Sequence, residues 1–300
     1  MADAFTQSCQ NSSGPKAHAR TKEVLDSLMK HLHAFCRETQ LTQDEWLLAC
    51  NELARAGQMS DAKRNELILI SDVLGIESLV DSMAHERAAA AAAAPVTDGA
   101  PAESAPTLSA ILGPFYRENA PKYPNGSDVV LDHSITDTNG KPGITASISG
   151  TVSDASGKPI VGAEIDVWFA GPNGLYEQQD PKQPAYNYRG LFTTDAQGAY
   201  SMRVLKPTAY PIPFDGPTGD ILRALDRSPM RPAHIHFLVK APGHKTLITQ
   251  LYDRDCEHVA ADAVFAVKDS LVVDFRPAAA DASHGAATEL RYDIVLAAAA

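Results

Sequence analysis

The chain has 300 residues, of which 44% are hydrophobic, so it can bury a full core and divide into two unequal parts. Its formal net charge of −11, without a cluster of Lys and Arg, excludes a nucleic acid or an anionic membrane as an expected partner. Four cysteines lack a CxxC spacing, and neither a signal peptide nor a membrane-spanning stretch is recognisable. We therefore expect a cytoplasmic protein.

Residues 21 to 84 have the pattern of several helices. Apolar residues recur every three or four positions between Val24 and Phe35, which is typical of one face of a helix. Thr42 and Glu45 then have the spacing of a capping box, in which each residue bonds to the backbone of the other at the start of a helix. These patterns predict a helical N-terminal domain over residues 1–87.

A third helix of this domain is expected from about Ser60 to Gly75, where glycine can end a helix in the left-handed conformation. Its predicted buried residues are Leu67, Ile68 and Ile70. Residues 88–106 consist mostly of Ala, Pro, Thr, Ser and Gly, which bury too little apolar surface to offset the entropy of ordering. We interpret them as an inserted linker that precedes a second domain over residues 107–300.

In the second domain the hydrophobic period changes from 3.6 to two, which is typical of strands. A strand from residue 144 to 152, a turn at 154–157 and a returning strand at 160–169 predict a hairpin, and the same pattern follows over 190–204 around a turn at 195–198. Tyr200, Met202 and Val204 are expected on one buried face. Further strands are expected at 233–240, 246–252, 270–275 and 290–296. The predicted fold is mixed but mainly β: a helical part followed by a β-sandwich.

Two histidines and two tyrosines in this domain form a candidate metal site. His234 and His236 are separated by one residue, so on a strand their side chains point to the same side. Tyr176 follows Gly-Leu in an expected loop, and Tyr210 opens a Tyr-Pro-Ile-Pro segment that stiffens its backbone. A His-x-His pair alone more often has a structural role, and the chain has nine tyrosines, so these patterns leave the choice of tyrosines open.

The type of ligand indicates the metal. A tyrosine side chain has a pKa of about 10, so ionising it at pH 7 costs about 4 kcal/mol, which only a strongly Lewis-acidic ion offsets twice. Zinc prefers Cys, His and carboxylate, and Ca²⁺ and Mg²⁺ prefer carboxylate and carbonyl oxygens. Non-haem Fe(III) suits two phenolates and two imidazoles. A ferrous site with two histidines and a carboxylate stays an alternative, and so does structural zinc, although zinc leaves the phenolates unexplained.

From Thr21 to the C-terminus, without the Ala-rich insert, the chain resembles the intradiol ring-cleaving dioxygenases, in the branch of the catechol 1,2- and hydroxyquinol 1,2-dioxygenases. Four motifs carry the resemblance: Gly-Ala-Glu-Ile-Asp-Val-Trp at 162–168, Gly-Leu-Tyr at 174–176, Tyr-Pro-Ile-Pro from residue 210 and Arg-Pro-Ala-His-Ile-His-Phe at 231–237. Ile-Leu-Gly-Pro-Phe-Tyr at 111–116 also resembles the family's segment beside the substrate.

The resemblance implies a ferric enzyme of aromatic-compound catabolism that cleaves catechol with O2 to cis,cis-muconate, without an organic cofactor. Tyr176 and His236 would be equatorial iron ligands, and Tyr210 and His234 axial ones. Tyr210 would also leave the iron and accept a substrate proton, and Arg231 with Gln250 would stabilise charge on the ring. Alternative substrates are hydroxyquinol, which would give maleylacetate, and chlorocatechols.

The resemblance also assigns a set of substrate-binding residues, namely Asp81, Ile111, Gly113, Pro114, Phe115, Ile212 and Val264. Each secondary assignment has a structural alternative: Arg231 as a buried ion-pair partner, Gln250 as a partner of backbone groups, and Asp81 as a solvated residue at a helix end. The helical part would form a homodimer and cradle a phospholipid. A function from another class, a non-catalytic transthyretin-like carrier module, would account for the strand pattern of residues 148–204.

Overall fold

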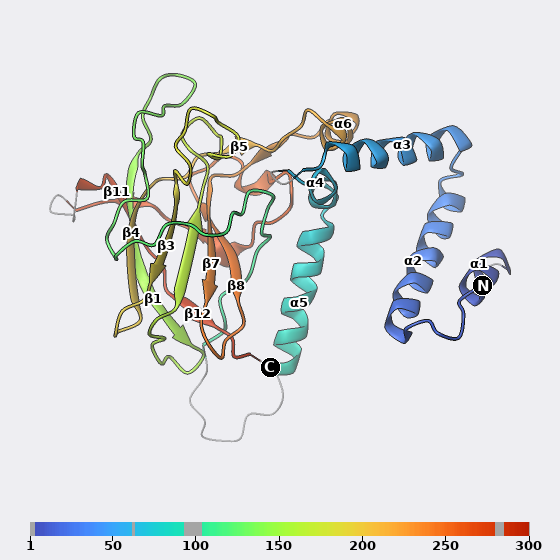
Figure 1. Cartoon of the computed structure of the whole chain (residues 1–300), viewed down its shortest axis with the longest axis horizontal. Coiled ribbons are helices and arrows are strands. Elements are labelled where there is room, and N and C mark those ends of the chain that lie inside the picture. The colour runs from blue at the N-terminus through green and yellow to red at the C-terminus, as the bar shows by residue number, and fades with distance from the viewer. Residues whose placement is uncertain (1–3, 62–63, 93–103, 280–284, 300) are drawn as a thin grey trace. The chain divides into compact units, whose positions relative to one another are not determined.

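The computed structural model describes residues 4–61, 64–92, 104–279 and 285–299, and the chain divides into two compact units, Met1–Gln58 and Met59–Ala300 (Figure 1). None of the helices described is long and apolar enough to cross a membrane. The division falls within the predicted helical domain, because the part of that domain from Met59 onward belongs with the sheets. The domain limits read from the sequence, 87 and 107, stay a prediction.

The first unit consists of α1 (Ala4–Asn11), α2 (Ala19–Glu38) and α3 (Gln43–Met59). The predicted capping box is present: the Thr42 N–H donates to the Glu45 carboxylate at 2.9 Å, and the Glu45 N–H donates to Thr42 Oγ1 at 3.3 Å. The predicted helix between Val24 and Phe35 is also confirmed. Its apolar side chains are not buried within this chain, however, since Val24, Leu25, Leu28, Leu32 and Phe35 are 47–50% exposed.

The second unit begins with α4 (Glu66–Val73) and α5 (Ile76–Ala92). Asn65 caps α4 by accepting from the Ile68 N–H at 3.1 Å, so the helix begins at Glu66 and not near Ser60. The predicted buried residues were wrong in part, because α4 buries Leu69 while Leu67 and Ile68 are exposed. The buried face of α4 consists of Glu66, Leu69, Asp72 and Val73, one to three positions away from the predicted residues.

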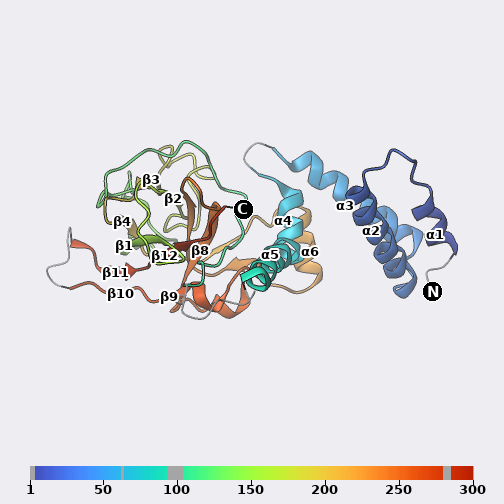
Figure 2. The same cartoon turned by 90° about the horizontal axis from the view of Figure 1, so that it is seen from below.

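Gly75 lies between these two helices with φ of +72°, as expected for a residue that ends a helix. The helix α5 then continues to Ala92, so the first five residues of the predicted linker are helical in backbone. The rest of that segment, up to residue 103, lies outside the described residues. A further helix, α6 (Pro217–Ala224), contacts α4, and Figures 1 and 2 show α4, α5 and α6 grouped at one side of the sheets.

The described strands form two five-stranded sheets and one short strand pair. The first sheet contains β1 (Thr145–Asp154), β4 (Ala199–Leu205), β10 (Arg276–Pro277), β11 (Thr288–Arg291) and β12 (Ile294–Leu296). The second has the order β3 (Arg189–Thr193), β2 (Glu164–Trp168), β7 (His234–Lys240), β8 (Leu247–Asp253) and β9 (Val272–Val273). The pair is β5 (Tyr210–Pro211) with β6 (Met230–Arg231), and two short 3-10 helices are η1 (Val259–Ala261) and η2 (Asp269–Leu271).

Both predicted hairpins are wrong, although the turns between their strands are present. The strand β1 pairs with β4, whereas β2 pairs with β3 and β7, so the chain crosses from one sheet to the other at each predicted turn. The turn at 154–157 is closed by the Gly157 N–H donating to the Asp154 carbonyl at 3.0 Å. Residues 290–296 form parts of two strands, β11 and β12, and the strand expected at 270–275 shrinks to Val272–Val273.

The two sheets share one apolar core. Ile148 and Met202 from the first sheet and Ile165 and Phe237 from the second belong to the same cluster of buried side chains. Tyr200, Met202 and Val204 are buried on one face of β4, as predicted. The opposite face of the second sheet carries a separate buried cluster, which includes Trp168, Tyr176, Tyr210 and Leu238. This outer face holds the candidate site.

Candidate metal centre and substrate cleft

Four side chains converge on the outer face of the second sheet. His234 and His236 lie two residues apart on β7, and both side chains are buried. Tyr176 comes from the loop after β2, where Gly174 with φ of +75° turns the backbone. Tyr210 lies on the two-residue strand β5, which is a more regular setting than the loop expected for it.

The donor atoms of these four side chains form a closed ring. The Tyr176 and Tyr210 hydroxyls are 3.0 Å apart, and the Tyr176 hydroxyl lies 3.1 Å from His236 Nε2. The Nε2 atoms of His234 and His236 are 3.2 Å apart, and the Tyr210 hydroxyl lies 3.4 Å from His234 Nε2. Ligands at about 2.1 Å from one transition-metal ion lie roughly 3.0 to 3.4 Å from one another. The ring therefore fits around a single ion.

The protonation states of the four groups also suit a metal. Burial, followed by the charge of Arg231, lowers the pKa of His234 well below its usual value, and burial does the same to the pKa of His236. The Nδ1 atom of His234 lies 2.6 Å from the Pro232 carbonyl and so carries the ring proton, which leaves the Nε2 lone pair facing the ring of donors. Burial raises the pKa of Tyr176 and Tyr210, so only a strongly Lewis-acidic ion would ionise them.

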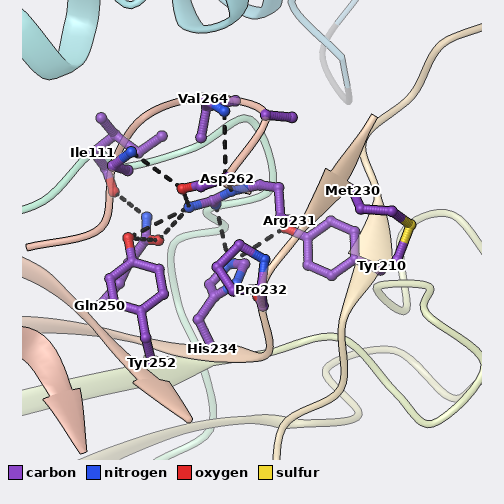
Figure 3. A network of polar contacts seen from close by, with 12 residues as sticks. Ile111, Tyr210, Met230, Arg231, Pro232, His234, Gln250, Tyr252, Asp262 and Val264 are labelled. Atoms are coloured by element: carbon purple, nitrogen blue, oxygen red, sulfur yellow. Dashed lines mark hydrogen bonds and ion pairs between the residues drawn. The ribbon is translucent and has the colours of Figure 1, made fainter. Parts of the chain in front are cut away.

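Arg231 sits beside this ring at the centre of a buried polar network (Figure 3). Its Nε donates to Asp262 at 3.1 Å, its Nη2 donates to Gln250 Oε1 at 2.7 Å, and its Nη1 lies 3.0 Å from His234 Nε2. Gln250 in turn donates to the Ile111 carbonyl at 2.6 Å and accepts from the Tyr252 hydroxyl at 2.8 Å. Both structural alternatives are thus present, since Arg231 has an ion-pair partner and Gln250 bonds a backbone group.

Aromatic rings pack against two of the four candidate ligands. Trp168 stacks on His236 with ring centres 4.6 Å apart and 13° between the planes. Phe115 stacks on Tyr176 with ring centres 4.6 Å apart. Gly113 lies against His236, since a Cβ atom there would be in van der Waals contact with His236 Cε1 at 3.4 Å, and its φ of +74° favours glycine. The segment 111–115 therefore lies directly against the candidate metal site.

A small, mainly apolar cleft of about 320 Å³ opens at this segment. Its lining residues come from α4, α5 and the segment after Ile111, and they are Ile68, Ser71, Ile76, Glu77, Val80, Leu112 and Gly113. Ile111, Ile212 and Val264 are buried in the core cluster that includes Val73 of α4, and Pro114 follows Gly113 in a turn. Of the predicted substrate-binding residues, Gly113 lines the cleft and Phe115 packs against the candidate ligand Tyr176.

Asp81 has a different setting from the one predicted. It lies inside α5 and not at a helix end, and its carboxylate pairs with Lys268 and accepts from the Ser109 hydroxyl. His85, one turn further along the helix, contacts the same serine. Asp81 therefore fixes α5 to the loops beside it.

Sequence reasoning missed three residues next to the predicted ones. Asp262 holds Arg231, and Tyr252 bonds both Arg231 and Gln250. Asp72 on α4 is 1% exposed, and among the described residues its Oδ1 atom has no hydrogen-bond partner. Burial, with Glu77 adding to it, raises the pKa of Asp72 to about 9, so the carboxyl is protonated at neutral pH. The sequence does contain a signal for Asp72, because an Asp among the apolar residues of a short helix is rarely buried without a functional reason.

A β-sandwich that gathers two phenols and two imidazoles at one point, beside a small apolar cleft, defines the class of metal-dependent enzymes that act on small molecules. The family model of the dioxygenases, described as "Dioxygenase", matches residues 111–298, and the model "Catechol dioxygenase N terminus" matches residues 18–92.

Individual relatives agree with the family models. The chain is 45% identical to catechol 1,2-dioxygenase of Candida albicans, over 92% of this chain and 84% of the relative. It is 40% identical to hydroxyquinol 1,2-dioxygenase of a Rhizobium species, over 86% and 80%. The solved structure of hydroxyquinol 1,2-dioxygenase from Pseudomonas putida superposes with a TM-score of 0.82 at 35% identity, covering 98% of each chain. The chain belongs to the intradiol ring-cleavage dioxygenases, a family of oxidoreductases that use non-haem iron.

Proposed function

We propose that this enzyme cleaves catechol between its two hydroxyl-bearing carbons with O2, giving cis,cis-muconate in aromatic-compound catabolism. Tyr176, Tyr210, His234 and His236 would hold the Fe(III) ion, and the observation that carries the proposal is the ring of their donor atoms, spaced 3.0 to 3.4 Å apart. Bound ferric iron would supply a Lewis acid that acidifies the diol and withdraws electron density from its ring.

The residues around the ring suit three further tasks. In its ionised form, Tyr210 would accept a proton from the diol on its phenolate oxygen, which lies 3.0 Å from that of Tyr176. Arg231 is held by Asp262 and Gln250, so its positive charge is already oriented before charge develops on the substrate. Gly113 and Phe115 would bound the ring plane, because one lies against His236 and the other stacks on Tyr176. Ile111, Pro114, Ile212 and Val264 would form the wall.

Asp72 favours a second candidate substrate, hydroxyquinol, which carries one more hydroxyl than catechol. Its protonated carboxyl interacts with Glu77, which lines the cleft, and with Arg231 in the proposed catalytic network. The Oδ1 atom lacks a partner among the described residues, and a buried polar group of this kind gains from bonding a substrate hydroxyl. A chlorocatechol has no third hydroxyl.

The experiment that tests both candidates supplies catechol and hydroxyquinol separately under air, and follows oxygen uptake and the ultraviolet spectrum of the product. Catechol cleavage to a muconate supports the proposal, and no oxygen uptake with either diol refutes it. Asp72→Ala should lower kcat/KM for hydroxyquinol at least about tenfold more than for catechol if Asp72 bonds the third hydroxyl. Glu257→Gln, a change at an exposed side chain, is the control.

We also propose a cytoplasmic homodimer that forms through the helical N-terminal part. Supporting this, five apolar side chains of α2 are about half exposed, and a face of this kind is typical of a helix that packs against another chain. A bound phospholipid would cover the same kind of surface. Organic extraction of the purified protein followed by mass spectrometry tests for the lipid, and the oligomeric state is considered in the Discussion.

A further inference from the structure

One row of side chains crosses the second sheet through the candidate metal centre. In the strand register Arg189 on β3 is opposite Trp168 on β2, Trp168 is opposite His236 on β7, and His236 is opposite Gln250 on β8. Directly opposite residues of antiparallel strands point to the same face of a sheet. All four side chains thus share the outer face, and the row runs from the catalytic network through a candidate ligand to Arg189.

Arg189 is a buried cation with an unusual set of partners. The residue is 1% exposed, and its Nε donates to the Glu177 carboxylate at 2.7 Å. Its Nη2 atom is buried and has no hydrogen-bond partner among the described residues. Its guanidinium carbon lies 5.9 Å from the centre of the Tyr176 ring. A buried charge is costly unless an opposite charge and hydrogen bonds offset it, and Glu177 offsets this one without satisfying Nη2.

Glu177 connects this cation to the candidate metal centre through the backbone, because it follows Tyr176 directly. Its side chain is 2% exposed and also accepts from Arg117 at 3.1 Å. Arg117 in turn lies over the ring of Tyr186, 4.0 Å from the ring centre. Two arginines and one glutamate thus lie beside a tyrosine that must become an anion to bind iron, and the Asp166 carboxyl also interacts with Arg189.

The backbone that presents Arg189 is itself in an uncommon conformation. Tyr186 and Tyr188 have φ of +65° and +59°, in the left-handed region that bulky residues rarely adopt. Tyr188 is fully buried, so the surrounding packing holds it there. Residues kept in sparsely populated conformations are concentrated at functional sites, where the surroundings offset their cost.

We propose that Arg189 is a positioning residue for the metal centre: with Glu177 it orients Tyr176 and sets the charge beside it, and so the strength with which this phenolate donates to iron. The inference rests on the proposed function, since it requires Tyr176 to be an iron ligand. A positive charge near a phenolate stabilises the electrons on it and weakens their donation to the metal, whereas a negative charge has the opposite effect.

The two charges of the pair therefore predict opposite spectroscopic shifts. Iron-loaded wild-type protein should show a visible band for charge transfer from phenolate to iron. Arg189→Met should move that band to longer wavelength, and Glu177→Gln should move it to shorter wavelength. The double variant should return close to the wild-type position, and Arg189→Lys, which keeps the charge, should stay closer to wild type than Arg189→Met.

A purely structural role for the pair predicts a different result, in which each variant loses iron or stability while the band of the remaining iron-loaded protein stays in place. That result, or shifts of the same sign in both single variants, overturns the inference. If Arg189→Met does not fold, Glu177→Gln alone decides by the direction of its shift. Arg254→Met, which removes an arginine from an exposed ion pair with Asp274, is the matched control and should leave the band unchanged.

The same measurements separate this inference from the proposed function. A wild-type protein without a visible band and without cleavage of either diol refutes the iron-dependent function itself. A wild-type protein with both properties, whose band is insensitive to the charges of Arg189 and Glu177, keeps the function and refutes only the role of the pair.

Discussion

Two single substitutions distinguish a proposed ligand that also accepts a proton, Tyr210, from one that only holds the iron, His236. Tyr210→Phe removes one hydroxyl from the ring of donors but keeps the aromatic packing, and we expect iron to be retained while kcat falls about 10²-fold, because the proposed proton acceptor is lost. His236→Ala, in contrast, removes a proposed ligand and leaves a cavity beside Trp168, so the iron should be lost.

Iron content per chain, measured together with kcat, tests these two expectations. Tyr123→Phe, at a partly buried tyrosine packed against the sandwich core, serves as the control and should change neither value. If Tyr210→Phe and His236→Ala lose iron to the same extent, Tyr210 is an ordinary structural ligand and its role as a proton acceptor is refuted.

Asp72 predicts a dependence of stability on pH. Its pKa is raised to about 9 in the folded protein, mainly by burial, whereas an unfolded Asp has a pKa of about 3.9. Between these values the folded state binds more protons than the unfolded state, so this group destabilises the protein increasingly as the pH rises through that window. Asp72→Asn should therefore melt higher than wild type, by a margin that grows from pH 5 to pH 9. A margin that is constant with pH, or that Glu257→Gln reproduces, argues against the buried, protonated carboxyl.

Some residues of the candidate site could be predicted from the sequence, and others could not. The spacing of His234 and His236 predicted that they share a face, whereas Tyr176 and Tyr210 could be chosen among nine tyrosines only through the family resemblance of the motifs around them. The structure brings the four donor atoms together. Asp81 was assigned through the family resemblance, and its role at the substrate stays a prediction. Asp72 was missed, because only the N-cap at Asn65 determines which face of α4 is buried. Asp262 and Arg189 lie 31 and 42 residues along the chain from Arg231, in opposite directions, so only the folded arrangement connects them with the site.

Among the elements, α3 offers a direct test of local sequence signals. Thr42→Ala removes one half of the capping box that begins this helix, and we expect a loss of about 1 kcal/mol in the free energy of unfolding of the part that contains it. Chemical denaturation followed by circular dichroism measures the loss. Thr246→Ala, at an exposed residue outside any helix, should cost less than a few tenths of that amount, and an equal cost would show that the cap does not stabilise α3.

The strands show why the alternation of residues predicted the sandwich but not its connections. The buried face of β4 was predicted correctly, since a period of two depends only on one strand and one core. Which strands pair was not encoded locally, because a turn such as the one at 154–157 can join two strands of one sheet or lead from one sheet to the next. The distinction depends on contacts with β7 and β11, which are far away in sequence.

The whole molecule should be more stable with its metal than without it. A ligand that binds only the folded state stabilises it by about 4 kcal/mol at a concentration a thousand times its Kd. Removing iron by chelation should therefore lower Tm, and adding Fe(II) under air should restore it together with activity. A chelated protein with an unchanged Tm contradicts a metal held by both tyrosines and histidines, because the three segments that carry them would then be held equally well without it.

The assembly of two chains can be tested on α2. Leu25 and Leu32 lie two turns apart on its exposed apolar face, and replacing both with Glu should convert the expected dimer into a monomer, because a buried charge opposes association. Analytical ultracentrifugation at several concentrations measures the change. Lys30→Glu, on the same helix, is the control. A wild-type protein that sediments as a monomer refutes the proposed dimer.

Alternate side chains of β7 serve the candidate metal site and the core, so the same strand register is needed for activity and for folding. His234 and His236 point to the outer face, while Ile235 and Phe237, each fully buried, belong to the core between the sheets. A slip of one residue in this strand would move both imidazoles into hydrocarbon and put two hydrocarbon side chains where iron is expected. An inserted or deleted residue in β7 should accordingly abolish activity and solubility together, so this strand cannot acquire new chemistry by changes in length. The loops that carry Tyr176 and Phe115 can, and variation of specificity should be sought there.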